Sequence, residues 1–158
     1  MSALRSLTLA IELATRQRDE ADHALMQAHR AVQQAQGQLE QLQSYAAETE
    51  ARWATAAAAT VSAELMQHQH HFMHRLRHAI GLQGGVMADL QRQAEAARQR
   101  RLQEEVRRAA LEQLLKKKLA DRARLDARRE QKQMDELAVL KYARSVASGG
   151  GALNGERS

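Results

Sequence analysis

The chain has 158 residues with no proline, no cysteine and only 3% aromatic residues, which is too little bulky apolar material for an ordinary compact core. Alanine and leucine make up most of its 44% hydrophobic residues, a composition typical of coiled coils and long helices. The net charge of +5 is uneven, because residues 1–66 carry −3 and residues 67–158 carry +8. That asymmetry fits either an acidic or polyanionic partner or a helix that solvates itself.

The first predicted element is a helix over about residues 3–57, because its apolar residues recur at heptad spacing. Its seam, meaning the face expected to lie against another helix, consists of Leu4, Leu7, Ile11, Ala14, Arg18, Ala21, Leu25, Ala28, Val32, Ala35, Leu39, Leu42, Ala46, Thr49 and Trp53. Only Arg18 and Thr49 interrupt about seven apolar heptads, so this helix requires a partner helix. The alanines in its middle bury little area, and the expected stability is modest.

The position of the first turn has two interpretations from the sequence pattern. Thr60 or Ser62 could cap a helix that starts just before Glu64, a residue suited to a first turn. The alternative is the Gly-rich segment at 81–85, because each glycine inside a helix costs about 1 kcal/mol relative to alanine.

A second helix is predicted over about residues 62–146. Its expected seam begins with Leu65, Phe72, Leu76, Ala79, Ile80, Met87, Leu90, Ala94 and Ala97. The seam then drifts through Leu102, Val106, Leu111, Leu114, Leu115, Leu119 and Leu125 to Met134, Leu137 and Leu140. The Gly-rich residues 148–158 are predicted to be a disordered tail.

Catalytic apparatus is not visible in the sequence. The absence of cysteine excludes disulfides and cysteine-based zinc or redox sites, and no nucleophile sits beside a base or in a glycine-rich loop after a strand. We therefore expect no enzyme activity and no cofactor. No stretch approaches roughly 18 apolar residues, and Arg5 and Glu12 interrupt the first apolar pattern, so we expect neither a membrane span nor a signal peptide, and an intracellular protein.

Three segments in order resemble the FliJ family of flagellar type III export proteins. They are QLEQLQSYAAE at 38–48, HFMHRLRHAIGLQ at 71–83 and REQKQMDELA at 129–138, and the likeness extends over about residues 1–145. The resemblance implies an all-α, antiparallel two-helix coiled coil similar to the central stalk of rotary ATPases. It also implies a cytoplasmic protein at the flagellar base that associates peripherally with the inner membrane through the export gate. Its implied partners are the hexameric export ATPase, the cytoplasmic domain of the export gate protein and export chaperones.

The resemblance further implies a gate-docking patch. The matching residues are Gln38, Leu42, Tyr45, Phe72, Leu76 and Ala79. Thr49 and Gln83 depart from the family pattern. Facing residues in an antiparallel hairpin have a constant sum of residue numbers, and the two series pair at a sum of 121. The two series lie side by side only if the tip of the hairpin is near residue 60. This favours the turn at Thr60 or Ser62 and makes the Gly-rich segment at 81–85 a kink opposite Gly37.

The stalk resemblance places the contact with the ATPase ring at the open end of the hairpin. The residues expected there are Leu4, Leu7, Ile11, Lys132, Met134, Leu137 and Leu140. The basic run at 116–132 could meet acidic groups of a ring. It lacks interleaved aromatic residues and any base-reading motif, so no specific nucleic-acid binding is expected.

Five of the seven histidines lie between 68 and 78. At about 100° per residue, most of them fall opposite the expected seam, and we interpret them as a solvated polar face. His70, His74 and His78 have the i, i+4 spacing of helical metal-binding pairs, but no carboxylate lies within a turn of His74 or His78, and no metal is expected.

Two other functions stay open from the sequence. A stalk of a virulence-type secretion system would share the fold and the mechanism. A generic coiled-coil adaptor or a basic, nucleic-acid-binding helical protein is the alternative of a different class.

Overall fold

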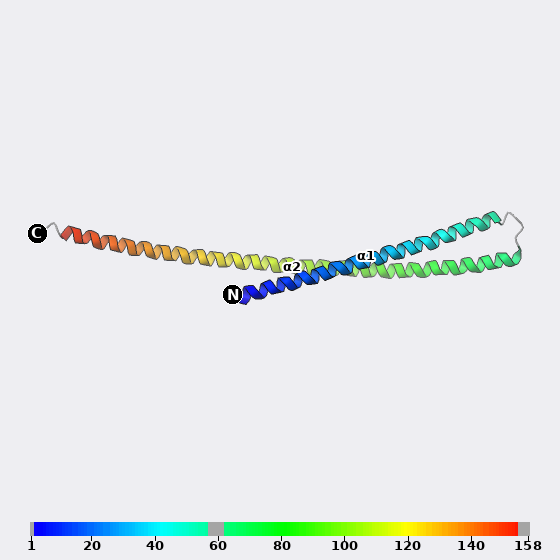
Figure 1. Ribbon diagram of the computed structural model, residues 1–158, viewed down its shortest axis with the longest axis horizontal. Helices are drawn as coiled ribbons and strands as arrows, with labels where there is room; N and C mark the ends of the chain where they lie inside the picture. Colours follow the sequence, from blue (N-terminus) through cyan, green and yellow to red (C-terminus); the bar gives the residue numbers. More distant parts are fainter. Residues whose placement is uncertain (1, 57–61, 155–158) are drawn as a thin grey trace. The chain divides into compact units, whose positions relative to one another are not determined.

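The chain folds into two α-helices, as the heptad pattern predicts. The computed structural model describes residues 2–56 and 62–154, with side chains described up to residue 149. Helix α1 spans Ser2–Ala56 and helix α2 spans Ala63–Asn154 (Figure 1). The described residues contain no strand, and the predicted all-α hairpin is confirmed.

Helix α2 begins at one of the two predicted capping residues. The backbone N–H of Leu65 donates to Ser62 Oγ at 3.4 Å, and the N–H of Met66 donates to the Ser62 carbonyl at 3.2 Å. Ser62 is therefore the N-cap of α2, and Glu64 lies in the first turn. The predicted tip near residue 60, with Thr60, lies outside the described residues.

The Gly-rich segment at 81–85 is part of α2, so the rival interpretation of a turn there is wrong. No described glycine has a positive φ. A Cβ added at Gly37, Gly81, Gly84 or Gly85 would meet no atom within 4 Å. The helices therefore leave enough space at these four positions for a methyl group.

The end of α2 lies later than predicted. The helix extends to Asn154, beyond the predicted end at about residue 146. The hydroxyl of Ser148 donates to the Ser145 carbonyl at 3.1 Å, so it bonds back to the preceding turn of the helix. Residues 155–158 lie outside the described part of the chain.

Contacts divide the chain into two units. The hairpin unit comprises residues 11–109, and the terminal unit comprises residues 1–10 and 110–158. In the hairpin unit, α1 and α2 run side by side in opposite directions (Figure 1). Gln38 with Gln83 and Arg18 with Glu105 are in contact across it, which agrees with the predicted constant sum near 121.

The core of the hairpin unit is narrow and rich in alanine. Its buried residues are Ala14, Ala21, Ala35, Met73, Leu76 and Ala94. Every predicted seam residue of α1 from Ile11 to Trp53 is buried or half-buried, so the α1 seam is confirmed. Because alanine buries little apolar area, such a core gives modest hydrophobic stabilisation.

The seam of α2 differs from its prediction at both ends of the hairpin unit. Leu65, Leu102 and Val106 are 52%, 40% and 67% exposed. The buried or half-buried seam positions form an unbroken heptad series instead: Gln69, Met73, Leu76, Ile80, Gln83, Met87, Leu90, Ala94, Ala97, Arg101, Glu104 and Arg108. The apolar residues near 102–106 face water because charged residues occupy the helix contact there.

In the terminal unit, Leu7 is buried, with 8% of its surface exposed, and Leu4, Leu111 and Leu115 are half-buried. Every described side chain from 116 to 149 is exposed, including the predicted seam residues Leu119 and Leu125. No helix in residues 2–56 and 62–154 has an apolar stretch long enough to cross a bilayer.

Candidate functional site

The residues expected to dock on the export gate lie on both helices of the hairpin unit. Gln38 and Tyr45 are exposed, Leu42, Phe72 and Ala79 are half-buried, and Leu76 is buried. Tyr45 is 49% exposed, a high value for an aromatic residue in a coiled coil. The predicted patch therefore consists of an accessible edge supported by Leu76 in the core.

An aromatic contact joins the two helices within this patch. The rings of Tyr45 and Phe72 meet edge to face, with centroids 6.0 Å apart and an angle of 83° between their planes. This geometry places the positive edge of one ring on the negative face of the other. Because α1 and α2 each contribute one ring, the contact fixes a rigid apolar projection on the surface.

A glutamine contact fixes the patch at its other end. Gln83 Nε2 donates to Gln38 Oε1 at 3.1 Å and to the Ala35 carbonyl at 3.2 Å. Gln83 is one of the two positions that depart from the pattern implied by the resemblance, and its side chain contacts α1. Its amide holds the Gln38 side chain and the register of the two helices at this point.

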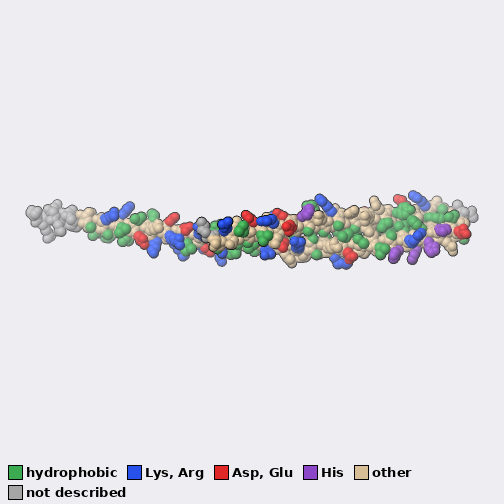
Figure 2. Space-filling view, turned by 60° about the horizontal axis from the view of Figure 1, so that its bottom comes forward, with side chains coloured by type: hydrophobic (Ala, Val, Ile, Leu, Met, Phe, Trp, Pro, Cys, Tyr) green, Lys and Arg blue, Asp and Glu red, His purple; other side chains and the backbone are tan. Residues whose placement is uncertain are grey.

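The clustered histidines lie on the surface, as predicted. His68, His70, His71, His74 and His78 are all exposed, and histidine side chains gather on one face in Figure 2. His70 and His74 line a shallow hollow with Glu50 and Met73. Within residues 2–56 and 62–154, no group of three or more histidine or carboxylate side chains is arranged to hold a metal ion.

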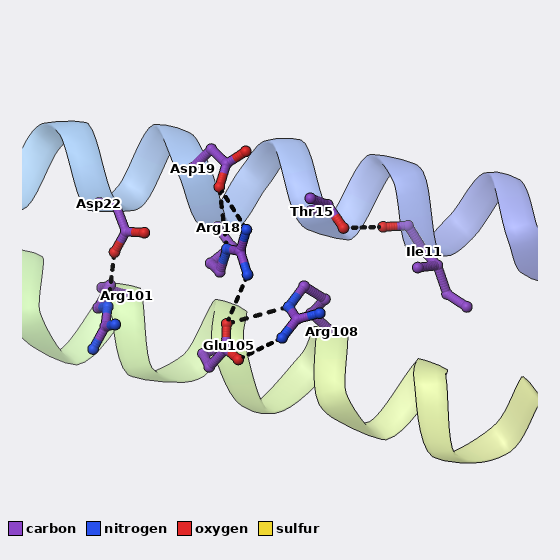
Figure 3. A network of polar contacts seen from close by, with 8 residues as sticks. All are labelled: Ile11, Thr15, Arg18, Asp19, Asp22, Arg101, Glu105 and Arg108. Atoms are coloured by element: carbon purple, nitrogen blue, oxygen red, sulfur yellow. Dashed lines mark hydrogen bonds and ion pairs between the residues drawn. The ribbon is translucent and has the colours of Figure 1, made fainter. Parts of the chain in front are cut away.

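A network of charged residues occupies the helix contact at the other end of the hairpin unit (Figure 3). Arg101 Nε donates to Asp22 Oδ1 at 2.7 Å, and Arg18 Nη1 lies 3.5 Å from Glu105 Oε2. Arg108 donates to the same glutamate at 2.7 Å. Ala14 and Ala21 on either side of Arg18 are 3% and 0% exposed, so the network is bordered by small, buried side chains.

The charged groups of this network shift each other's pKa values. The pKa of Glu105 is lowered, first by the hydrogen bond from Arg108 and less strongly by Arg18. The pKa of Arg18 is raised, mainly by its hydrogen bond to Asp19. Outside this network, Glu95 pairs with Arg98 along α2, and hydrogen bonds from Arg98 and Gln99 lower its pKa to about 2.

Sequence reasoning missed these ion pairs and the burial of Met73, although a signal for the pairs exists. Asp22 with Arg101 and Arg18 with Glu105 each have residue numbers that sum to 123. This sum is within two of the 121 that paired the docking residues, so the same rule would have placed these opposite charges within about half a helical turn of each other.

Acid should weaken this contact in a way that depends on Glu105. Because its pKa is lowered in the folded state, its stabilising effect is fully present above its ordinary pKa of 4.5 and is lost as pH falls through the lowered pKa. We expect Glu105→Gln to lower the thermal unfolding midpoint at neutral pH, and the gap from the original chain to shrink in acid. A gap that stays constant down to pH 2 would contradict this, and Arg18→Gln should add little to Glu105→Gln.

The residues expected at the ATPase ring fall into two environments. Leu4 and Ile11 are half-buried and Leu7 is buried, so they serve the helix contact. Lys132, Met134, Leu137 and Leu140 are exposed, and the three apolar side chains are 67%, 57% and 57% exposed. Lys132 and Leu140 line a shallow hollow on α2 together with Val139. Only the α2 group is accessible to a partner as it stands.

Comparison with known proteins identifies one family. A family model described as Flagellar FliJ protein matches residues 3–147. No curated protein and no solved structure matches the chain.

Proposed function

The chain belongs to the flagellar FliJ protein family, and on that premise we propose that it is the stalk of the hexameric export ATPase and links this ring to the export gate. Family membership makes it a flagellar, export-related protein. The observation that carries the stalk proposal is the α2 segment at 116–149, in which every side chain is exposed. Apolar side chains that are exposed along a single helix are typical of a surface that binds a partner.

As a stalk, the protein would hydrolyse nothing. The apolar residues Met134, Leu137 and Leu140 would insert in the ring, and the basic run at 116–132 would meet its acidic groups. Leu4, Leu7 and Ile11 pack in the helix contact, so their proposed part in ring binding would be to support α2 rather than to touch the ring. The protein would promote assembly of the ATPase subunits and pass their conformational changes along the helices.

The output end would be the docking patch on the hairpin unit. Tyr45 and Phe72 form its rigid aromatic projection, and Gln38 is held in place by Gln83. Exposed aromatic anchors that are already fixed in the free protein lose little side-chain entropy on binding. The patch would dock on the cytoplasmic domain of the export gate protein and hold the chain near the inner membrane. Export chaperones are further proposed partners.

Removing either ring should weaken gate binding and spare the fold. We expect Tyr45→Ala and Phe72→Ala each to reduce affinity for the purified cytoplasmic domain of the gate by roughly tenfold, as for aromatic interface anchors. Tyr45→Phe keeps the ring contact and should bind more tightly than Tyr45→Ala. Isothermal titration calorimetry measures the affinities.

Circular dichroism of the same variants separates a docking role from a structural one. His71→Ala is the matched control, because this exposed residue is adjacent to Phe72 in the chain. If Tyr45→Ala lowers helicity or the unfolding midpoint as much as it lowers binding, the ring stabilises the core and the docking role fails.

A further inference from the structure

We propose that residues 118–132 of α2 form a basic seam that pairs with an acidic α-helix of the export ATPase. The proposal rests on the stalk function and specifies the face of the helix and the kind of partner. It concerns one line of residues on α2 and not its overall charge.

The seam is defined by the heptad phase of α2. Within the terminal unit, Leu111 and Leu115 are half-buried while Gln113 and Leu114 are exposed, which marks the side of the helix that is covered. The same heptad spacing continues with Lys118, Arg122, Leu125, Arg129 and Lys132. An unpaired helix drifts from this phase by only ~20° per heptad, so these five side chains stay on one face.

This face is open and positively charged. All five side chains are exposed, and Leu125 is 53% exposed. Within the described part of the chain, Arg122, Arg129 and Lys132 form no ion pair, whereas Arg124 on another face pairs with Asp121. The cations of the seam are therefore available to an external partner.

The spacing of the cations fits a helix better than a flexible acidic chain. Side chains three and four apart on one helix meet their counterparts on a second helix of similar pitch. Four cations around one leucine would be complemented by carboxylates around one apolar residue. This seam has the same heptad phase as Leu111 and Leu115. It therefore continues the face of α2 that contacts another helix in the preceding heptads.

A nucleic acid fits this face less well. No aromatic residue lies between 116 and 132, so stacking on bases is absent. Asp121 and Asp126 flank the seam and would repel a phosphate backbone, while they could attract basic residues beside the acidic core of a partner helix.

Two double variants test the proposal with the same change of charge and composition. The seam variant, Arg122→Glu with Lys132→Glu, reverses the charge at two positions of the seam. The outer variant, Lys117→Glu with Arg124→Glu, reverses the charge of one lysine and one arginine outside the seam. The full chain is titrated at physiological salt against three probes: the purified export ATPase, a synthetic three-heptad peptide with Glu around a central Leu at its core positions, and duplex DNA. Circular dichroism confirms that the variants are helical.

We expect the seam variant to bind the ATPase and the acidic peptide at least ~10-fold more weakly than the original chain, and the outer variant to change by less than about threefold. Equal losses for both variants would overturn the seam in favour of diffuse charge attraction. Tighter binding of DNA than of the peptide would also overturn it. If the original chain does not bind the ATPase, the stalk function fails, while the peptide titration still decides the seam.

Discussion

Deletion of residues 129–145 is expected to abolish stimulation of the export ATPase, leaving its rate at the level of the enzyme alone. The deleted segment contains Lys132 and the exposed apolar residues Met134, Leu137 and Leu140. None of it belongs to the hairpin unit at 11–109, so the docking patch should persist. Steady-state ATP hydrolysis with increasing amounts of the variant measures the effect.

A pair of triple variants tests the same contact without changing the length of the helix. Met134, Leu137 and Leu140 changed to serine remove the proposed ring-binding side chains. The control changes Tyr142, Ala143 and Val146 to serine. All three are exposed, and Tyr142 and Val146 are 74% and 56% exposed. At about 100° per residue, the two triplets lie on opposite faces of the helix.

The first triplet should eliminate most of the stimulation and the second should preserve it. Loss of stimulation with both triplets would show that apolar character alone is required. Full stimulation by the deletion variant would contradict a ring contact at this end of α2, provided that gate binding is intact.

Replacement of Gly81, Gly84 and Gly85 by alanine is expected to stabilise the protein by roughly 3 kcal/mol, about 1 kcal/mol for each position. All three glycines lie inside α2 with negative φ, and an added Cβ at each meets nothing within 4 Å. Alanine therefore reduces the backbone entropy lost on folding without steric cost. For a chain of this size, the thermal unfolding midpoint should rise by roughly 6–12 °C.

The matched control for the glycine variant is Ala88→Gly, one turn further along α2, where Ala88 is half-buried. It should lower the stability by about 1 kcal/mol. If the triple alanine variant is no more stable than the original chain, the helix does not continue through this segment in solution. If it is more stable but stimulates the ATPase less, the glycines supply flexibility that function requires.

The ion pairs and the alanine core together explain how this hairpin combines a fixed register with modest stability. Ala14 and Ala21 allow α1 and α2 to approach, and Arg18 and Glu105 then specify which residues face each other. A one-heptad slip would separate these charges and the Gln38 and Gln83 amides, at a cost that the uniform alanine seam alone would not impose.

The sequence by itself determined the first helix and the way in which the chain folds back. The α1 seam follows one uninterrupted heptad, and its burial can be read from spacing because a coiled-coil helix covers the same face in every turn. The constant sum near 121 located the contact between Gln38 and Gln83 and argued against a turn at residues 81–85, which are helical. The exposure of the histidines followed from the same periodicity.

Only the tertiary structure decided the seam of α2. Its apolar residues offer more than one stripe, and which stripe is buried depends on the residues that α1 presents. Met73 is buried beside the half-buried Phe72, and Val106 is displaced into water where Asp22 and Arg18 of α1 attract charged partners. Burial is a property of the pair of helices, whereas periodicity is a property of one, and for this reason the pattern of α2 alone could not settle it.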